Sequence, residues 1–517
     1  MAGVRDRPYL LGLLAVVAVG AVYVRAVPPG LPYDEPSHWS TVMFYATHHR
    51  MPVLGDPGVT YEAQMGPAAY VLDAVVVHAA GTARRGFEVV RMLGVIELAA
   101  AAAFVFALTR RVAPVYVAAA ATVVFALNPM LLTMSASVQN DTLALALGLA
   151  ALELAIARLS SRPSAGITVL VGAVAGLAIL TKLTAWVLVP GVAGWLVCRH
   201  RRESVQAVAT FIAAATAACG WWFVRNIILY GDLTGAQAVS RTGVNFSRYH
   251  LHSPTDLGHV VQEAITYLWL PTEYLRNTIS AGPAVKGAVV LLTAAIAVAG
   301  LTRRPAKFVP LVGVCALLSV AAWLATYFSY EAVAPRVAYM ALPLWVALIA
   351  AGLSRLPRRS VLVAPLVVVA ALNVWTIEKI RSVPNPPSPI TTSTNDLRLA
   401  FSRTACSTPV STKSKSEERR RQQLRQPLNR EAVVVHRRQL LEVSSRRRRA
   451  ALAIRAVPPS ELPAYAATDA VKAIVHHRQR RLTRLQRLRA DAPRGTRDPN
   501  EDRAPSGCLR PTRSRHS

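Results

Sequence analysis

The sequence has 517 residues, of which 53% are hydrophobic and only 17% are charged, and its mean hydropathy is +0.34. Such a composition argues against an ordinary soluble domain of this length. The formal net charge is +30, and the segment from Arg381 to the end, with 30 basic and 11 acidic residues, contributes +19 of it. An apolar region and a basic region therefore meet near residue 380.

Eleven apolar stretches approach the length of roughly 20 residues that a helix needs to span a bilayer. Soluble sheets are excluded, because these stretches offer no polar face. The stretches lie at about 8–26, 91–109, 112–133, 142–158, 165–181, 183–198, 205–224, 284–301, 308–328, 337–353 and 361–377. We therefore predict that residues 1–380 form an all-α polytopic transmembrane bundle of about 11 spans, and that its first span is retained rather than cleaved.

Basic clusters predict the orientation of this bundle in the cell membrane, because short cytoplasmic loops are rich in Lys and Arg. The clusters fall in alternate short connections, at 110–111, 158–162, 199–202, 303–307 and 355–359. This places the amino terminus in the cytoplasm if the stretch 67–80 is interfacial or re-entrant. Two long loops, 27–90 and 225–283, then lie outside.

The first of these loops contains an amphipathic helix. Its apolar residues Trp39, Val42, Met43 and Ala46 recur at helical spacing, which predicts a helix lying along the membrane surface.

The segment 381–517 begins with a Pro-rich linker and continues with Arg-rich runs that lack apolar periodicity. We expect it to be largely disordered. Three explanations stay open: a tail for an anionic surface or a nucleic acid, a plain disordered extension, and translation of a shifted frame in a GC-rich gene. We expect no nucleic-acid partner and assign no function to this segment.

Charged side chains close to lipid are costly, so each one is a candidate functional residue. Three acidic and three basic residues fall at predicted outer ends of helices: Asp34, Glu35, Asp141, Lys182, Arg225 and Arg336. Carboxylates can act as general bases or metal ligands, and arginines bind phosphate through two hydrogen bonds. This combination suits transfer chemistry on an anionic, lipid-linked substrate.

Each of these residues also has a plain structural explanation. Asp34 and Asp141 precede helices and could simply cap them. Lys182 could extend its ammonium towards water at a tight turn, and Arg225 and Arg336 could anchor helix ends.

The same residues lie in motifs that resemble the GT-C glycosyltransferases, which include the protein O-mannosyltransferases and the bacterial aminoarabinose transferases. The matching segments are 32–38 (PYDEPSH), 61–70 (YEAQMGPAAY), 140–141, 176–184, 221–226 and 335–339. Two of them depart from the family pattern. Gly66 replaces the first proline of a Pro-Pro-x-x-Tyr segment, and two residues separate Arg336 from Tyr339, where the family has an adjacent pair.

The resemblance implies a transferase that uses a polyprenyl-phosphate sugar donor and a glycan, lipid or protein acceptor. Asp34 would be the general base that activates the acceptor hydroxyl, and Glu35 and Asp141 would orient that hydroxyl or help to bind a cation. The remaining implied roles are donor-phosphate binding for Lys182, Arg225 and Arg336, and positioning of the acceptor or loop for His38, Tyr70 and Asn226. No organic cofactor is expected, and a divalent cation is left open.

Two other classes of protein compete with a transferase. A transporter or flippase of lipid-linked glycans would also place arginines near phosphate, and a non-catalytic membrane protein could share the fold. A transporter predicts internal repeats and breaks in the middle of its spans. The sequence has no convincing repeat, and its candidate charges lie at span ends, which favours the transferase.

Overall fold

The computed structural model describes residues 7–32, 34–201, 204–240, 254–272, 274–275, 278–301, 309–330, 335–354 and 357–384. These residues contain helices and connecting loops but no β-strand, which confirms the all-α prediction. The segment from residue 385 onward, including nearly all of the basic region, lies outside the described residues.

Helices follow one another closely along the described chain. Their bounds are α1 Arg7–Ala26, α2 Glu35–His48, η2 Tyr61–Gln64, α3 Ala68–Ala80, α4 Ala83–Thr109, α5 Val115–Ala126, α6 Pro129–Ser135, α7 Asp141–Leu159, α8 Ala165–Thr181, η3 Leu183–Val187, α9 Leu188–His200, α10 Ser204–Tyr230, α11 Ala236–Ser240, α12 Pro254–Trp269, α13 Pro283–Leu301, α14 Val309–Tyr330, η5 Pro335–Ala341, α15 Leu342–Leu353 and α16 Arg358–Arg381.

All eleven apolar stretches predicted from the sequence contain helix where they are described. Within the described residues, however, only five helices are long and apolar enough to cross a membrane, or six if the bent pair α5–α6 counts as one span. Several others, such as α8 and α15, are apolar but shorter. The protein is an integral membrane protein, and the number of spans stays a prediction.

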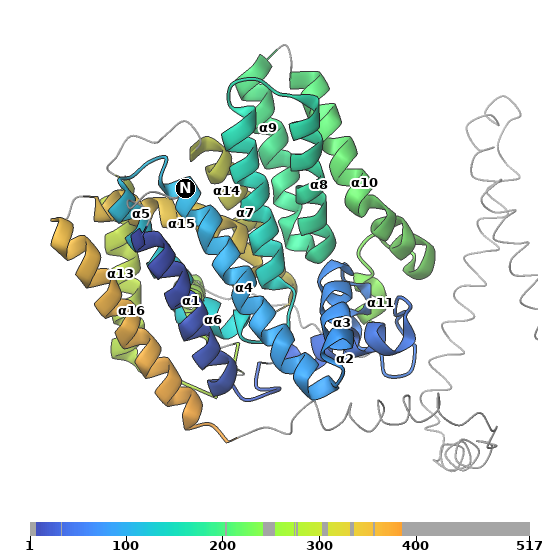
Figure 1. Ribbon diagram of the computed structural model, residues 1–517, viewed down its shortest axis with the longest axis horizontal. Coiled ribbons are helices and arrows are strands. Elements are labelled where there is room, and N and C mark those ends of the chain that lie inside the picture. Colours follow the sequence, from blue (N-terminus) through green and yellow to red (C-terminus); the bar gives the residue numbers. More distant parts are fainter. Residues whose placement is uncertain are drawn as a thin grey trace, which may run out of the picture. The chain divides into compact units, whose positions relative to one another are not determined.

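The helices α1, α4, α7, α8 and α10 pack in a row, each against the next (Figure 1). Close approach within this row depends on small residues. A Cβ atom added to Gly176 in α8 would lie 2.5 Å from the carbonyl oxygen of Ala215 in α10, which no side chain tolerates. Membrane helices commonly pack through such small residues, because lipid supplies no hydrophobic force between them.

A sharp bend between α5 and α6 shapes the end of the bundle that carries the candidate residues. The two helices meet at 60°, and the Asn128 side chain caps α6 by accepting hydrogen bonds from the backbone N–H groups of Met130 and Leu131. Proline at the first position of α6 needs no hydrogen-bond partner there. The chain then returns through residues 136–140 to begin α7 at Asp141.

The first long loop folds back onto α4 through α2, η2 and α3. Trp39 of α2 is fully buried, and its ring meets the Phe87 ring edge-on at 5.0 Å. The apolar face of α2 therefore packs against protein, which corrects the expectation that it lies on the membrane surface. At position 66 the chain passes so close to α8 that a Cβ atom would lie only 1.9 Å from the Leu180 carbonyl oxygen. This close approach explains why glycine replaces the first proline of the family's Pro-Pro-x-x-Tyr segment.

Candidate active site

Asp34 lies at the point where the first loop enters α2. Its position is that of an N-cap, but its side chain makes no capping hydrogen bond. One carboxylate oxygen instead accepts a hydrogen bond of 2.9 Å from the Tyr61 hydroxyl, and the other pairs with Arg336. The carboxylate of Asp34 is therefore held towards other loops, so the simple capping explanation does not account for it.

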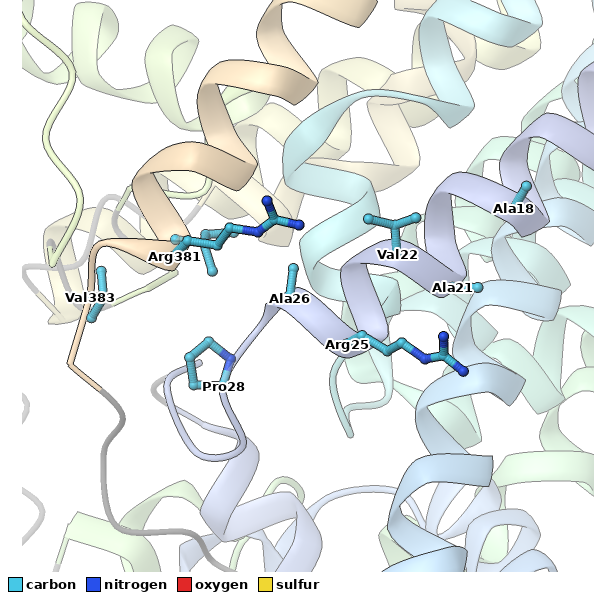
Figure 2. Close-up of a pocket in the computed structure, with 9 residues that line it drawn as sticks. Ala18, Ala21, Val22, Arg25, Ala26, Pro28, Arg381 and Val383 are labelled. Carbon is cyan, nitrogen blue, oxygen red and sulfur yellow. The ribbon is translucent and has the colours of Figure 1, made fainter.

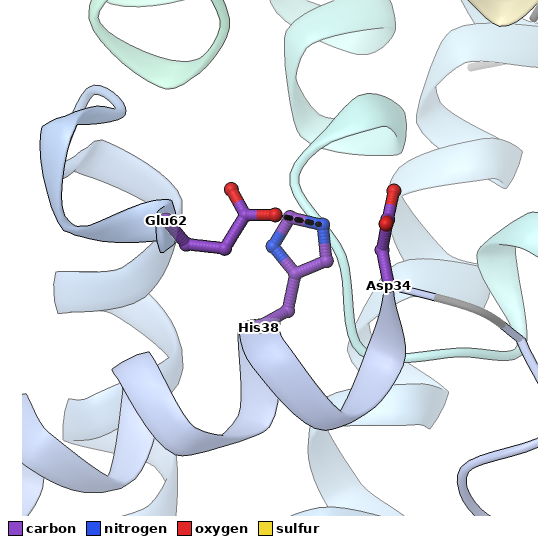
Figure 3. Close-up of side chains that lie close together, drawn as sticks. All are labelled: Asp34, His38 and Glu62. Atoms are coloured by element: carbon purple, nitrogen blue, oxygen red, sulfur yellow. Dashed lines mark ion pairs between the residues drawn. The ribbon is translucent and has the colours of Figure 1, made fainter. Parts of the chain in front are cut away.

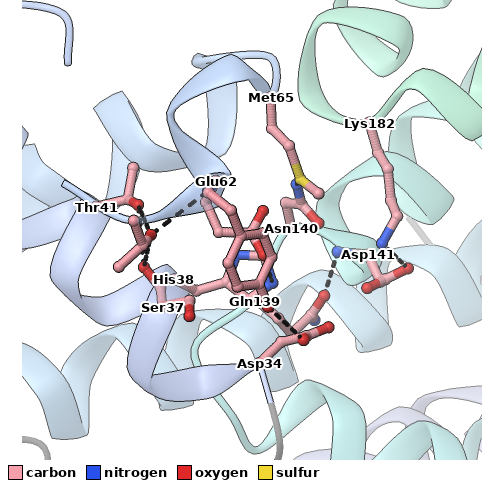
Figure 4. Close-up of polar contacts among 12 residues, drawn as sticks. Asp34, Ser37, His38, Thr41, Glu62, Met65, Gln139, Asn140, Asp141 and Lys182 are labelled. Carbon is pink, nitrogen blue, oxygen red and sulfur yellow. Dashed lines mark hydrogen bonds and ion pairs between the residues drawn. The ribbon is translucent and has the colours of Figure 1, made fainter. Parts of the chain in front are cut away.

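Asp141, at the start of α7, supplies a second buried carboxylate (Figure 4). Its Oδ1 atom lies 2.6 Å from the Lys182 ammonium. Lys182 can reach Asp141 because helix α8 ends at Thr181 and the backbone of Lys182 is extended before η3 begins. The neighbouring Asn140 amide donates to the Thr181 carbonyl and ties the two chain segments together.

Arg336 joins the two carboxylates. It lies on η5, is only 9% exposed, and makes an ion pair with Asp34. A second nitrogen of the same guanidinium lies 3.8 Å from Oδ2 of Asp141. The Tyr274 ring stands beneath the guanidinium at 5.5 Å. One arginine thus bridges residues from α2 and α7, as a planar group with five donors can.

His38, one helical turn after Asp34, connects this cluster to the loop residue Glu62 (Figure 3). Its Nδ1 atom lies 2.8 Å from the Tyr70 hydroxyl, and its Nε2 atom lies 3.9 Å from Glu62. His38 and Glu62 are each 1% exposed. The sequence predicted positioning roles for His38 and Tyr70, and the structure puts both beside Glu62.

Burial sets the protonation of these groups. It lowers the pKa of His38 to about 4, against the opposing field of Asp34. It raises the pKa of Glu62 to about 8, and the charge of Asp34 adds to the effect. Burial also acts to raise the pKa of Asp34, but the charge of Arg336 and the hydrogen bonds that Asp34 accepts from Arg336 and Tyr61 act against burial, and the net effect is a lowered pKa. At neutral pH the site therefore holds an ionised Asp34, a neutral imidazole and a protonated Glu62.

Asp34, His38 and Glu62 form a set of groups that could hold a cation. Each offers one ligand atom, and these atoms lie within 4.8 Å of one another. Two carboxylates and a neutral imidazole are a donor set that suits zinc and other divalent ions. The residues fit a cation, with the condition that Glu62 must first lose its proton.

Glu35, expected beside Asp34 as a helping carboxylate, is directed elsewhere. It is fully buried and forms a two-pronged ion pair with Arg91 of α4, at 2.8 and 2.6 Å. It also accepts hydrogen bonds from the backbone N–H groups of Gly30 and Val138. These contacts connect the loop before Asp34 with the loop before Asp141. Glu35 thus holds the two acidic loops in place and does not point into the cluster.

Arg225 and Asn226, both predicted near the substrate, make their contacts away from Asp34 and Asp141. The Arg225 guanidinium donates to the Pro52 carbonyl at 2.6 Å and stacks on the Trp222 ring at 4.4 Å. The Asn226 amide donates to the Gln64 carbonyl at 3.3 Å. None of these contacts reaches Asp34 or Asp141, so the structure does not bring Arg225 and Asn226 together with these two carboxylates, and donor-phosphate binding by Arg225 stays a prediction.

Three participants were missed by sequence reasoning, namely Tyr61, Glu62 and Arg91. Tyr61 and Glu62 stand in the segment 61–70 that had been singled out, but only Tyr70 was chosen from it. Arg91 carries a charge in an otherwise apolar helix, and such a charge is itself a signal. Its partner could have been sought among the acids near the same end of the bundle.

This all-helical fold, with buried acids and cations gathered at one end, defines a membrane protein with an enzyme-like polar site. Residues 81–222 match the model of the dolichyl-phosphate-mannose-protein mannosyltransferase family. The match confirms the predicted resemblance for a region that includes Asp141 and Lys182, while Asp34 and Arg336 lie outside it. No curated protein matches the chain.

Several solved structures are similar to this one at low identity. ArnT from Cupriavidus metallidurans bound to undecaprenyl phosphate has 14% identity and a TM-score of 0.48, over 76% of this chain and 75% of that one. The apo oligosaccharyltransferase of Archaeoglobus fulgidus has 13% identity and a TM-score of 0.42, over 77% of this chain and 58% of that one. Its complex with Zn and sulfate has 13% identity and a TM-score of 0.43, over 72% and 54%. The chain thus spans less than two thirds of the length of the archaeal enzyme.

Proposed function

We propose that this protein is an integral-membrane glycosyltransferase that moves a sugar from a polyprenyl-phosphate donor to an acceptor hydroxyl at the outer face of the membrane. The observation that carries the proposal is the bridge of Arg336 between Asp34 and Asp141, with Lys182 beside Asp141. It gathers two carboxylates and two cations in one buried cluster. The match of residues 81–222 to a family named for a lipid-phosphate sugar donor supports the same chemistry.

The proposed reaction divides its work between the carboxylates and the cations. Asp34 accepts the proton of the acceptor hydroxyl as that oxygen bonds to the anomeric carbon of the sugar. The bond between that carbon and the phosphate oxygen breaks, and the phosphate leaves with the electron pair. Arg336 and Lys182 stabilise the negative charge that develops on it.

The pairing of Asp34 with Arg336 gives the donor a role in activating the base. While the ion pair holds, Arg336 lowers the pKa of Asp34 and weakens it as a base. A donor phosphate competes for the same guanidinium. Its binding would draw Arg336 away and leave Asp34 free to accept a proton, so the base becomes effective only when a donor is present.

We also propose a site for a divalent cation and an orientation of the chain in the membrane. Asp34, His38 and Glu62 would hold a divalent cation, which when bound would polarise an oxygen of the substrate. The amino terminus would be cytoplasmic and residue 380 external, in a cell membrane. Reporter fusions after residues 110, 230 and 380 test this orientation, and an external signal at 110 contradicts it.

The substitution Asp34→Asn tests the proposed activity. Asparagine caps helices about as well as aspartate, so a capping role predicts full activity. A base role predicts a loss of transfer of roughly 10²-fold or more, because the amide accepts no proton. Asp56→Asn is the matched control, since Asp56 lies in the same loop and pairs with Arg50 instead.

Transfer of sugar from a lipid-phosphate donor is measured in membranes and normalised to protein level. An active Asp34→Asn protein contradicts the assigned role. A protein that moves the lipid-linked sugar across the bilayer without transferring it supports the flippase alternative.

A further inference from the structure

A second polar feature lies outside the Asp34 cluster, between the ends of α1 and α16. A cleft of about 580 Å³ is lined there by Ala18, Ala21, Val22, Arg25, Ala26, Pro28, Ile380, Arg381 and Val383 (Figure 2). The residues from α1 recur at positions 18, 21, 22 and 25, which is one face of the helix. Two alanines on this face leave room that larger side chains would fill.

Two arginines, one from each helix, give this cleft a positive charge. Arg25 and Arg381 are both exposed and both contribute to its lining, although they lie at opposite ends of the described chain. Among the described residues, no ion pair joins either arginine to a carboxylate. The cleft thus combines an apolar wall with two cations whose charge is not offset by a carboxylate of the described residues.

The surroundings of the cleft are those of a lipid-facing surface. Leu10, Leu11 and Leu14 of α1 are 49–66% exposed, and Val367 and Val374 of α16 are 61% and 67% exposed. Within the stretch of α1 that lines the cleft, the Tyr23 hydroxyl donates to Asn373 at 2.7 Å and holds α1 against α16. The cleft therefore lies beside a fixed contact, between two helices with exposed apolar side chains.

We propose that this cleft binds one anionic phospholipid of the surrounding membrane, with its phosphate between Arg25 and Arg381 and its chains along Ala18, Ala21 and Val22. Charge complementarity favours an anionic headgroup over a zwitterionic one. None of the residues of the Asp34 cluster lines the cleft, so it is separate from the proposed donor site.

The cleft also touches the segment that leads to Asp34. Pro28 forms part of its wall, and the Pro28 carbonyl accepts a hydrogen bond from Arg91, which in turn holds Glu35. A lipid in the cleft would therefore support the loop from residue 27 to Asp34. Binding should raise the melting temperature of the protein, since a ligand that binds only the folded state stabilises it.

Native mass spectrometry of the purified full chain tests the proposal, with phosphatidylglycerol, phosphatidylcholine and undecaprenyl phosphate as separate probes. We expect wild type to retain one phosphatidylglycerol and little phosphatidylcholine. At about 1 kcal/mol per arginine, the double variant Arg25→Gln/Arg381→Gln should retain phosphatidylglycerol about 30-fold more weakly. Arg85→Gln is the control, because Arg85 is an exposed arginine in the first turn of α4 and does not line the cleft.

A cleft-filling variant, Ala21→Phe, keeps both charges and should also lose the bound lipid. If the double variant has too low a melting temperature to be measured, Ala21→Phe alone tests whether the lipid binds in the cleft. Equal retention of phosphatidylcholine by wild type, or undiminished phosphatidylglycerol in Ala21→Phe, means that the arginines only attract lipid loosely at the surface and overturns the proposal. Displacement of phosphatidylglycerol by undecaprenyl phosphate assigns the cleft to the donor and overturns it as well. None of these outcomes depends on sugar transfer.

Discussion

Arg336 forms an ion pair with Asp34 across 302 residues of sequence, and the same guanidinium lies 3.8 Å from Asp141. The pair brings together an early and a late segment of the described chain at a single buried point. It also means that the proposed base and the proposed phosphate ligand neutralise each other until a substrate separates them. Under the proposed reaction, the functional state of the site would be governed by what competes for this one arginine.

The shape of the Arg336 side chain matters for the proposed reaction as well as its charge. Arg336→Lys should reduce transfer by roughly 10²-fold, because an ammonium lacks the planar fork of donors that binds phosphate through two parallel hydrogen bonds. Arg225→Lys is the matched control and should keep transfer within a few-fold, since Arg225 contacts Pro52 and Trp222 instead. Transfer rates in membranes check both variants. Equal losses in the two would place Arg225 at the substrate after all.

Glu35 should matter for stability rather than for chemistry. Glu35→Gln leaves the Arg91 charge buried without its partner, and breaking a buried pair in this way typically costs about 3–5 kcal/mol. We expect a clear fall in the melting temperature of the detergent-solubilised protein, with residual activity in proportion to folded protein. Glu62→Gln should show no such fall at neutral pH, because Glu62 is already protonated there. A Glu35→Gln protein of normal stability and no activity would restore the catalytic role.

The raised pKa of Glu62 predicts a pH dependence of stability. Its pKa goes from 4.5 in the unfolded chain to about 8 in the folded protein, so the folded state binds more protons between these values. Its contribution to stability is complete below pH 4.5 and is lost as the pH rises to about 8. Glu62→Gln should flatten this decline when unfolding is measured from pH 5 to 8. An identical slope in the variant would show that Glu62 does not titrate in this range.

Cation binding should depend on the same proton. Zn²⁺ must displace the proton of Glu62, so its affinity in calorimetric titrations should rise by about tenfold per pH unit between pH 6 and 8. His38→Ala and Glu62→Gln should both abolish this binding, whereas His48→Ala, in the last turn of the same helix, should not. Undiminished binding in His38→Ala would mean that the cation sits elsewhere.

Removal of residues 391–517 should leave the membrane domain folded and inserted. The segment offers too little periodic apolar surface to complete a core. The amount of monodisperse protein recovered in detergent, and its melting temperature, measure the outcome. A truncated protein that aggregates would show that the tail contributes to the fold.

The sequence by itself determined the helical architecture and the approximate membership of the site. Long apolar runs must satisfy their backbone hydrogen bonds internally, so helices follow directly from composition. Hydropathy and basic clusters also placed Asp34, Asp141, Lys182 and Arg336 at one end of the bundle, and these four do meet in the structure. Helix formation and the end of the bundle at which a charge lies depend on local composition and on the order of the spans, and both can be read from the sequence.

Only the tertiary structure decided which of the candidate charges meet. Asp34 and Glu35 are adjacent in sequence, but neighbouring residues at the start of a helix point about 100° apart and so reach different partners. Asp34 pairs with Arg336 and Glu35 pairs with Arg91, because two helices far apart in the sequence, η5 and α4, bring those cations next to them. Arg225 has the same charge and is predicted to lie at the same membrane face, yet its helix carries it to Pro52. Pairing of this kind depends on long-range packing, and no local pattern in the sequence encodes it.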